Sequence, residues 1–211
     1  KTPLQSIIGS AELLENGLVK PEDQPRFLNR IHQEADRLVA LINDILRLSQ
    51  LDEGGALPHE QVSVLELAQE AARSLTAQEA AQAVHISVTG TAGTVFGVRR
   101  LLYEIARNLC ENAVKYNVPG GSVTVEVAET DRDVTLLVRD TGIGIPEGDQ
   151  SRVFERFYRV DKSHSRAIGG TGLGLSIVKH AVAYHHGTLR LESQLGKGTV
   201  ITVTLPKKPT E

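Results

Sequence analysis

Two asparagines and a lysine recur at helical spacing in the segment Asn108-Leu-Cys-Glu-Asn112-Ala-Val-Lys115-Tyr116. Residues three or four apart share one face of a helix, so these three side chains should point the same way. An amide oxygen can ligate Mg²⁺, and an ammonium group can form an ion pair with a phosphate. The pattern therefore suits a metal-bound polyphosphate, although an ordinary solvated polar face would show the same spacing.

Two glycine-rich turns also carry potential chemistry. The first, Asp140-Thr-Gly142-Ile-Gly144, leaves a strand-like segment, and the second, Gly169-Gly170-Thr171-Gly172-Leu173-Gly174, opens a helix-like one. Glycine permits close backbone approach, and the N–H groups at a helix start attract phosphate. Neither turn matches a Walker loop or the dinucleotide fingerprint. Tight turns without a ligand would explain them equally well.

A mixed α/β pattern positions these motifs within residues 60–206. Helices are predicted over 64–79, 99–117 and 171–185, and strands over 84–88, 122–129, 134–140, 187–193 and 199–205. Because strands and helices do not alternate strictly, we expect an α+β fold: a mixed, largely antiparallel sheet with helices on one face. The stretch 145–170 offers only one short helix, near 149–157, and such a stretch in a compact domain is usually functional or mobile.

Residues 1–53 have a different character and read as a helical hairpin. Steps of three, four and seven leave a narrow apolar stripe on the second helix, and charged residues such as Arg37 and Asp44 fall mostly off it. The stripe comprises Leu28, Ile31, Ala35, Leu38, Ile42, Ile45 and Leu48. Two helices cannot bury it well, so a homodimeric four-helix bundle is predicted, with packing onto the rest of the same chain as the alternative. The run 52–55 is typical of a linker.

Composition excludes several classes of protein. Lys and Arg number 23 against 26 Asp and Glu, so the charge pattern predicts no nucleic-acid partner. No apolar run approaches the roughly 18 residues of a membrane span, so no membrane contact by this segment is expected. The single cysteine, Cys110, excludes an internal disulfide and is expected in the core. Because the 211 residues start at Lys1 and include no Met, we expect a fragment of a longer protein.

The order of the motifs resembles the ATP-binding region of sensor histidine kinases, the Bergerat fold shared with gyrase, the Hsp90 chaperones and MutL. The Asn-rich segment and the first glycine turn are followed by Phe154-Glu-Arg-Phe157-Tyr-Arg159, the second glycine turn and Gly196-Lys-Gly198-Thr. Lys1-Thr2-Pro3-Leu4 resembles the end of the family's His-Glu-Leu-Lys-Thr-Pro-Leu box. The hairpin then corresponds to the dimerisation and histidine-phosphotransfer domain. One departure is that the acceptor histidine would precede Lys1.

The resemblance implies a role for each site residue. Asp140 would accept a hydrogen bond from the adenine amino group, Gly142 and Gly144 would let the backbone approach the base, and Tyr116 would stack near it. Asn112 would ligate Mg²⁺. The side chains placed around the phosphates would be Asn108, Lys115 and Arg159.

The lid and the start of the chain complete this set of roles. Gly170, Thr171, Gly172, Leu173 and Gly174 would close over the nucleotide. Phe154 and Phe157 would anchor the lid to the bundle, or serve as ordinary core aromatics. Thr2, in the fourth position after the family's acceptor histidine, would orient water for dephosphorylation of the regulator. It fits an ordinary helix start equally well. The sequences around Asn117 and Arg159 also resemble those of phosphate-responsive sensor kinases.

The implied activity is ATP-dependent transfer of the γ-phosphoryl group to a histidine, then to an aspartate on the receiver domain of a response regulator. The full-length protein would be anchored in a bacterial membrane, with this part in the cytoplasm. A hydrolytic ATPase of the same superfamily is the main rival. Those proteins carry a glutamate four residues before the Mg²⁺-binding Asn, where this chain has Asn108, and Glu111 is expected on another side of the helix.

Two further alternatives are a non-catalytic nucleotide-binding module and an anti-sigma type serine kinase, which would lack the hairpin. The histidines offer little chemistry of their own. We expect His32 to be solvated, and His180, His185 and His186 to have surface or capping roles.

Overall fold

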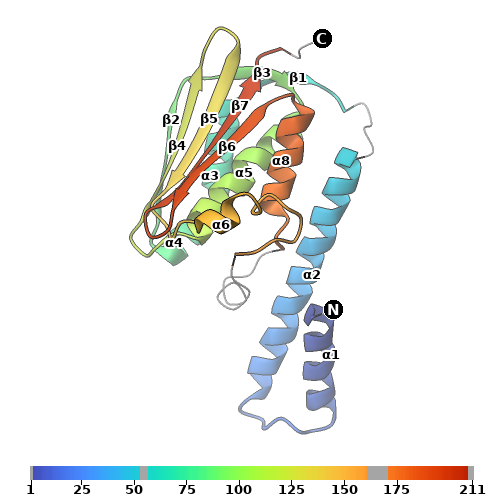
Figure 1. The fold of residues 1–211 in the computed structure, drawn as a ribbon. Coiled ribbons are helices and arrows are strands. Elements are labelled where there is room, and N and C mark those ends of the chain that lie inside the picture. Colours follow the sequence, from blue (N-terminus) through green and yellow to red (C-terminus); the bar gives the residue numbers. More distant parts are fainter. Residues whose placement is uncertain (1, 53–56, 161–170, 209–211) are drawn as a thin grey trace.

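The computed structural model describes residues 2–52, 57–160 and 171–208. It begins with the predicted hairpin, formed by α1 (Thr2–Glu15) and α2 (Gln24–Asp52), which run side by side (Figure 1). The Arg30 Nε group donates a hydrogen bond to Ser6 Oγ at 3.1 Å across this pair. Because α2 has 29 residues and α1 has 14, the second half of α2 extends past α1 and lies along the rest of the chain.

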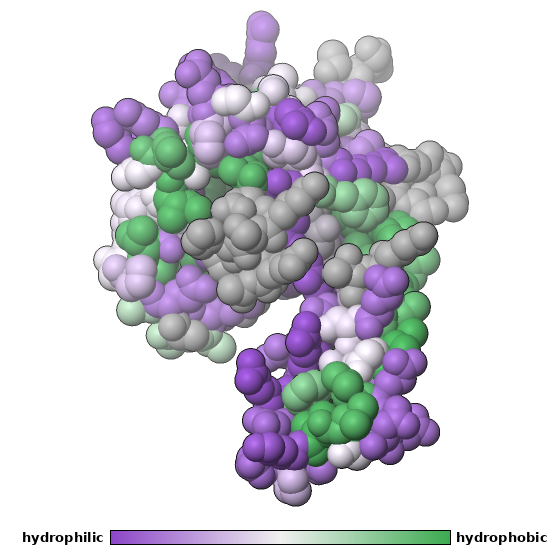
Figure 2. All heavy atoms as spheres, turned by 60° about the horizontal axis from the view of Figure 1, so that its bottom comes forward, coloured by the Kyte–Doolittle hydropathy of each residue, from purple (hydrophilic) through white to green (hydrophobic). Residues whose placement is uncertain are grey.

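The surface of the hairpin is rich in apolar side chains (Figure 2). Along the predicted stripe, Leu28, Ile42 and Ile45 are exposed by 53%, 55% and 44%. Among the hairpin side chains that the structure describes, the other large exposed apolar residues are Leu4, Ile8, Leu13, Leu18, Val39 and Leu46. Much of the stripe is therefore not buried by packing within one chain.

Five strands form the main sheet in the order β2-β4-β5-β7-β6. Their bounds are β2 His85–Gly90, β4 Ser122–Glu129, β5 Asp133–Asp140, β6 Thr188–Gln194 and β7 Gly198–Pro206. Strands β2 and β4 run parallel, and the other neighbouring pairs run antiparallel, which confirms the predicted mixed sheet. The separate antiparallel pair β1 (Glu60–Ser63) and β3 (Thr94–Gly97) was not predicted.

Helices α3 (Val64–Ser74), α5 (Arg99–Lys115) and α8 (Gly174–Tyr184) cover one face of this sheet (Figure 1). The helix predicted over 64–79 is divided at Leu75, after which α4 (Thr76–Gln82) begins. Ser63 caps α3, where its Oγ accepts a hydrogen bond from the Glu66 N–H at 3.3 Å. Ser followed by Glu three residues later is a capping-box sequence, which sets where this helix starts.

Alternation along the strands builds the core beneath these helices. Val125 pairs with Val138 and Leu136 with Val203 across β4, β5 and β7, and each is at most 3% exposed. Cys110 is fully buried, as predicted, and burial raises the pKa of its thiol to about 12. Because the apolar face of α5 faces this core, its asparagines and lysine are left on the side that lines the cavity described below.

The segment after β5 has little regular structure. The helix predicted near 149–157 is mostly wrong: a four-residue helix, α6 (Glu147–Gln150), ends at Gln150, and turns and a bend follow over 151–157. The Tyr158 hydroxyl donates a hydrogen bond to Asp149, which holds this segment against the end of α6. The remainder of the predicted irregular stretch, 161–170, lies outside the described residues.

No helix in the described part of the chain is both long enough and apolar enough to cross a membrane.

Candidate nucleotide-binding site

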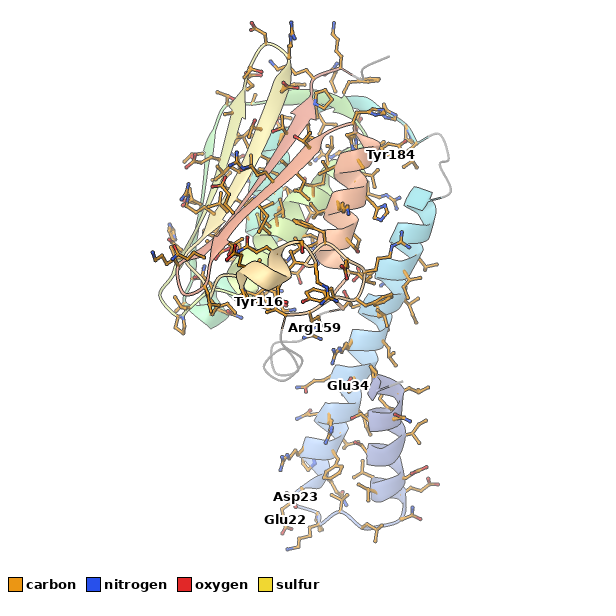
Figure 3. The ribbon with its side chains drawn as sticks, in the orientation of Figure 1. Glu22, Asp23, Glu34, Tyr116, Arg159 and Tyr184 are labelled. Carbon is orange, nitrogen blue, oxygen red and sulfur yellow. The ribbon has the colours of Figure 1, made fainter. Side chains whose placement is uncertain are left out.

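A cavity of about 880 Å³ lies between the α/β domain and α2. This volume falls within the range of roughly 300–1,000 Å³ typical of small-molecule sites. Tyr116 and Arg159 both lie at the lower end of the α/β domain in the view of Figure 3. The sequence-predicted site residues that line the cavity are Asn108, Asn112, Lys115, Tyr116, Asp140, Gly144, Arg159, Thr171, Gly172 and Gly174.

Two other predicted site residues, Gly142 and Leu173, are described by the structure and do not line the cavity. Gly142 is buried behind it, packed against the backbone of Tyr116. Leu173 is fully buried and packs with Ile177 and with Leu41 of α2, so its side chain is part of a small core rather than of the cavity wall. Gly170 and the side chain of Thr2 fall outside the described residues.

Asp140 ends β5 at the cavity and has its two carboxylate oxygens in different situations. Its Oδ1 accepts hydrogen bonds from the backbone N–H groups of Gly142 at 2.8 Å and Thr199 at 3.2 Å. Burial raises the pKa of this carboxyl group, and the two N–H groups act in the opposite direction. No hydrogen bond from another described residue occupies Oδ2. This oxygen is therefore available to a donor on a ligand.

Glycines allow the segments around Asp140 to approach one another closely. A Cβ on Gly142 would come within 2.2 Å of the Tyr116 carbonyl oxygen, and one on Gly144 within 2.1 Å of the Gln194 carbonyl oxygen. Gly144 also has a φ of +69°, which favours glycine. Both positions thus require glycine because another backbone segment packs against them, and not only because the chain turns there.

Two residues that sequence reasoning missed hold this region in place. Asn117 Nδ2 donates to the carbonyl oxygens of Ala113 at 3.1 Å and Ser122 at 3.0 Å. Thr141 Oγ1 accepts from the Ser122 N–H at 2.9 Å and lies 3.2 Å from Asn117 Oδ1, to which it can donate. These bonds join the end of α5 to the start of β4 and the end of β5. Both residues directly adjoin predicted motifs, which is the only sequence signal for them.

On α5, Asn108 is oriented by the residue one turn before it. Its Nδ2 donates to the Glu104 carbonyl oxygen at 2.8 Å and to the Glu104 Oε2 at 3.2 Å. The amide oxygen then lies toward the start of α8, where a Cβ on Gly174 would come within 2.8 Å of it. Glu104, which is 8% exposed, is a third residue of this region that sequence reasoning missed.

Positive charge gathers beside these amides. The pKa of Lys115 is lowered, chiefly by burial and further by Arg159 and by Arg37 of α2, while Glu111 raises it. Burial also lowers the pKa of Arg159, and Arg37 again acts in that direction. Such a grouping suits an anion. Glu111 lines the cavity as well, contrary to the expectation that it faces elsewhere, and it pairs with Arg107 at 3.3 Å.

The described residues include no group of three or more His, Cys, Asp or Glu side chains that could hold a metal ion. His185 is buried at the end of α8, where its Nδ1 donates to the Ala181 carbonyl oxygen at 2.8 Å and its Nε2 accepts from the Val98 N–H at 3.0 Å. His32 is exposed, as expected. The amide oxygens of Asn108 and Asn112 and single carboxylates such as Glu111 are the oxygen groups that line the cavity.

Two protein families match the chain. The family described as histidine kinase-, DNA gyrase B- and HSP90-like ATPase matches residues 97–209. The His kinase A (phospho-acceptor) domain matches residues 1–54.

Individual proteins are similar over most of the chain. Sensor-like histidine kinase SenX3 of Mycolicibacterium smegmatis is 40% identical over 99% of this chain and 55% of its own length. The chain thus spans about half the length of that relative. The solved structure of mycobacterial sensor histidine kinase MprB is 34% identical, with a TM-score of 0.60 over 72% of this chain and 100% of that one. The structure of histidine kinase ThkA in complex with response regulator protein TrrA has a similar fold, with a TM-score of 0.77 at 21% identity over 99% of this chain and 58% of that one.

Proposed function

The chain belongs to the histidine kinase family. From this premise we propose that it binds Mg·ATP in the cavity beside Asp140 and transfers the γ-phosphoryl group to a histidine on the helical hairpin of the same protein. The observation that carries the proposal is the polarity of the cavity. An acceptor oxygen lies at Asp140, amides and cations lie on α5 and after α6, and the hairpin forms the opposite wall.

At the base end, the Oδ2 of Asp140 would accept a hydrogen bond from the adenine amino group. Guanine presents a carbonyl oxygen at that position, which would leave two acceptors opposed and one of them unsatisfied. Tyr116 and Ile143 also line the cavity, and the Ile143 N–H donates to the Tyr116 carbonyl oxygen at 3.0 Å. Their side chains would offer surfaces against the purine ring. The site should therefore prefer ATP to GTP.

At the phosphate end, the residues present fit a magnesium nucleotide. Asn112 and the amide oxygen of Asn108 supply neutral oxygen ligands, and Mg²⁺ usually completes its coordination with water and substrate phosphates. When bound, the ion would neutralise phosphate charge. Lys115 and Arg159 would hold the phosphate oxygens in line with the acceptor. The start of α8 at Gly174 adds backbone N–H groups, which favour a phosphate.

The hairpin would supply the acceptor in this reaction. We assign residues 1–53 to dimerisation and phosphotransfer and residues 60–206 to ATP binding. The family's box places the acceptor histidine before Lys1, and Glu34 of α2, beside the start of α1, also lines the ATP cavity (Figure 3). The phosphoryl group would then pass to an aspartate of a response regulator, and Thr2 would help in its later removal.

The same geometry argues against hydrolysis as the main activity. Asn108 stands where the hydrolytic relatives carry a glutamate, and an amide cannot accept a proton from water. The nearby Glu104 does not replace that glutamate, because its Oε2 accepts a hydrogen bond from Asn108 Nδ2 and lies 4.0 Å from Arg107 Nη1.

We propose that the hairpin also joins two chains. The exposed apolar residues of α1 and α2 would be covered in a four-helix bundle. Sensor kinases of this family suggest, in addition, that the full-length protein is anchored in a membrane, with this part in the cytoplasm.

A complementation assay tests the proposal. This chain would be mixed with labelled ATP, Mg²⁺ and a second form that carries His-Glu-Leu before Lys1 together with Asp140→Asn, which removes its own ATP binding. We expect acid-labile, base-stable phosphate on the second form only. Brisk release of free phosphate with no labelled protein would support the hydrolytic ATPase and contradict the kinase.

A further inference from the structure

Helix α2 is part of the cavity wall and not only a connection between domains. Its residues that line the cavity are Gln33, Glu34, Arg37, Ala40, Asn43 and Asp44. Thr171 Oγ1 donates a hydrogen bond to Asp44 Oδ2 at 2.7 Å, which joins the segment before α8 to the hairpin. Leu41 packs against Leu173 and Ile177 beside this bond. A ligand in the cavity would therefore touch both parts of the chain.

Arg37 is the cation that α2 brings to this wall. Lys115 lies on α5 and Arg159 follows α6, so three different segments each contribute one positive charge. Arg37 lowers the pKa of Lys115 and of Arg159, in both cases after the larger effect of burial, so the three groups are close enough to repel one another. Glu111, which has the larger charge effect on Lys115, offsets part of this repulsion at Lys115, and an anion between the three cations would offset more of it.

The described neighbours of Arg37 neutralise its positive charge only weakly. Its Nη1 lies 4.0 Å from Glu34 Oε2, beyond hydrogen-bonding distance. That same oxygen is buried and has no hydrogen-bond partner among the described residues. A guanidinium group has five N–H donors and can bind phosphate oxygens in a bidentate manner. The Arg37 side chain, which is 29% exposed, has donors available for a ligand in the cavity.

We propose that Arg37 is a third phosphate-binding residue of the nucleotide site, contributed by the hairpin, so that the polyphosphate of ATP links the hairpin to the α/β domain. The proposal rests on the nucleotide site proposed above and adds a residue and a coupling to it. Binding of the polyphosphate relieves the repulsion among Arg37, Lys115 and Arg159. Nucleotides with phosphates therefore stabilise the docked hairpin, whereas the nucleoside alone does not.

Calorimetric titrations with adenosine, ADP and ATP, each with Mg²⁺, separate this role from a purely structural one. Arg37→Gln removes the charge and keeps a polar side chain, and Arg37→Lys keeps the charge. Arg30→Gln is the matched control, because Arg30 lies on the same helix, bonds to Ser6 and does not line the cavity. Loss of a charge-assisted hydrogen bond that is partly exposed should weaken ATP binding about five- to tenfold in Arg37→Gln.

We expect adenosine affinity to change less than about twofold in Arg37→Gln, Arg37→Lys to recover much of the ATP affinity, and Arg30→Gln to resemble the wild type. A second readout is hydrogen exchange of the α2 backbone, which ATP should slow in the wild type but not in Arg37→Gln. Unchanged ATP affinity in Arg37→Gln would overturn the inference. Equal losses for ATP and adenosine would overturn it too, because Arg37 would then act through folding. If the wild type bound none of the three ligands, the proposed function itself would fall, and the inference with it.

Discussion

Replacing Asp140 by Asn should abolish most ATP binding while leaving the fold intact. The substitution keeps an oxygen that can accept from the Gly142 and Thr199 N–H groups, now at 2.8 Å and 3.2 Å. It replaces the second oxygen by an NH₂ group, which would face the adenine amino group donor to donor. A lost charge-assisted hydrogen bond costs about 1.5–3 kcal/mol. At about 1.4 kcal/mol per factor of ten, the Kd for ATP should rise about ten- to hundredfold.

The thermal stability of the ligand-free Asp140→Asn variant should not fall together with its affinity for ATP. Burial raises the pKa of Asp140, so the ionised carboxylate is disfavoured in the folded protein without ligand. A neutral amide avoids this cost, and the Tm of the ligand-free variant should not fall. Guanine offers a carbonyl oxygen to the new NH₂ group, so the preference for ATP over GTP should also shrink.

Calorimetry with both nucleotides and thermal unfolding of the ligand-free protein provide the test. Asp131→Asn, in the exposed turn at the other end of β5, is the control. An unchanged ATP affinity in a folded Asp140→Asn variant would refute the assignment of the adenine site. A fall in Tm that parallels the loss of affinity would show that Asp140 acts through stability.

Three further outcomes follow from the structure. Gly142→Ala should lower the free energy of unfolding by about 2 kcal/mol or more and the Tm by several degrees, because the new Cβ would lie 2.2 Å from the Tyr116 carbonyl oxygen. Gly148→Ala, whose Cβ would have no atom within 4 Å, should leave the Tm nearly unchanged in the same melting experiment. Replacing Ile42 and Ile45 by Ser should shift the chain from dimer to monomer in light scattering at tens of micromolar, and a wild type that is already monomeric with no gain in solubility from the change would contradict the dimer. Burial lowers the pKa of His185 below its ordinary value of 6.5, so the unfolded chain binds more protons than the folded one below that pH. The free energy of unfolding should therefore fall as the pH drops from about 6.5 toward the lowered pKa. A series of denaturant titrations that showed no such loss, or the same loss in His185→Gln, would argue against this role of His185.

Much of the site could be predicted because its signals are local. The spacing of Asn108, Asn112 and Lys115 is enough to place them on one face of a helix, and the structure brings all three to the same cavity. The alternation in 122–129 and 134–140 likewise predicts two strands close to their observed bounds, because side chains alternate with a period of two whatever the rest of the chain does.

The parts that could not be predicted depend on contacts between distant segments. Arg37 and Asp44 read as polar residues beside an apolar stripe, yet they line the cavity because Leu41 of α2 packs against Leu173 and Ile177 of α8 and its start. The bond from Thr171 to Asp44 joins residues 127 positions apart, which no periodicity can indicate. Strands β1 and β3 have four residues each, too few for alternation to stand out, and they exist because they pair with each other.

The most direct test of the account is a crystal structure of this chain with Mg²⁺ and a non-hydrolysable ATP analogue. The account predicts the adenine amino group within hydrogen-bonding distance of Asp140 Oδ2, the metal on Asn112, and the phosphates among Lys115, Arg159 and Arg37. A nucleotide bound outside this cavity, or one with its phosphates at Asp140 and its base among the cations, would contradict it.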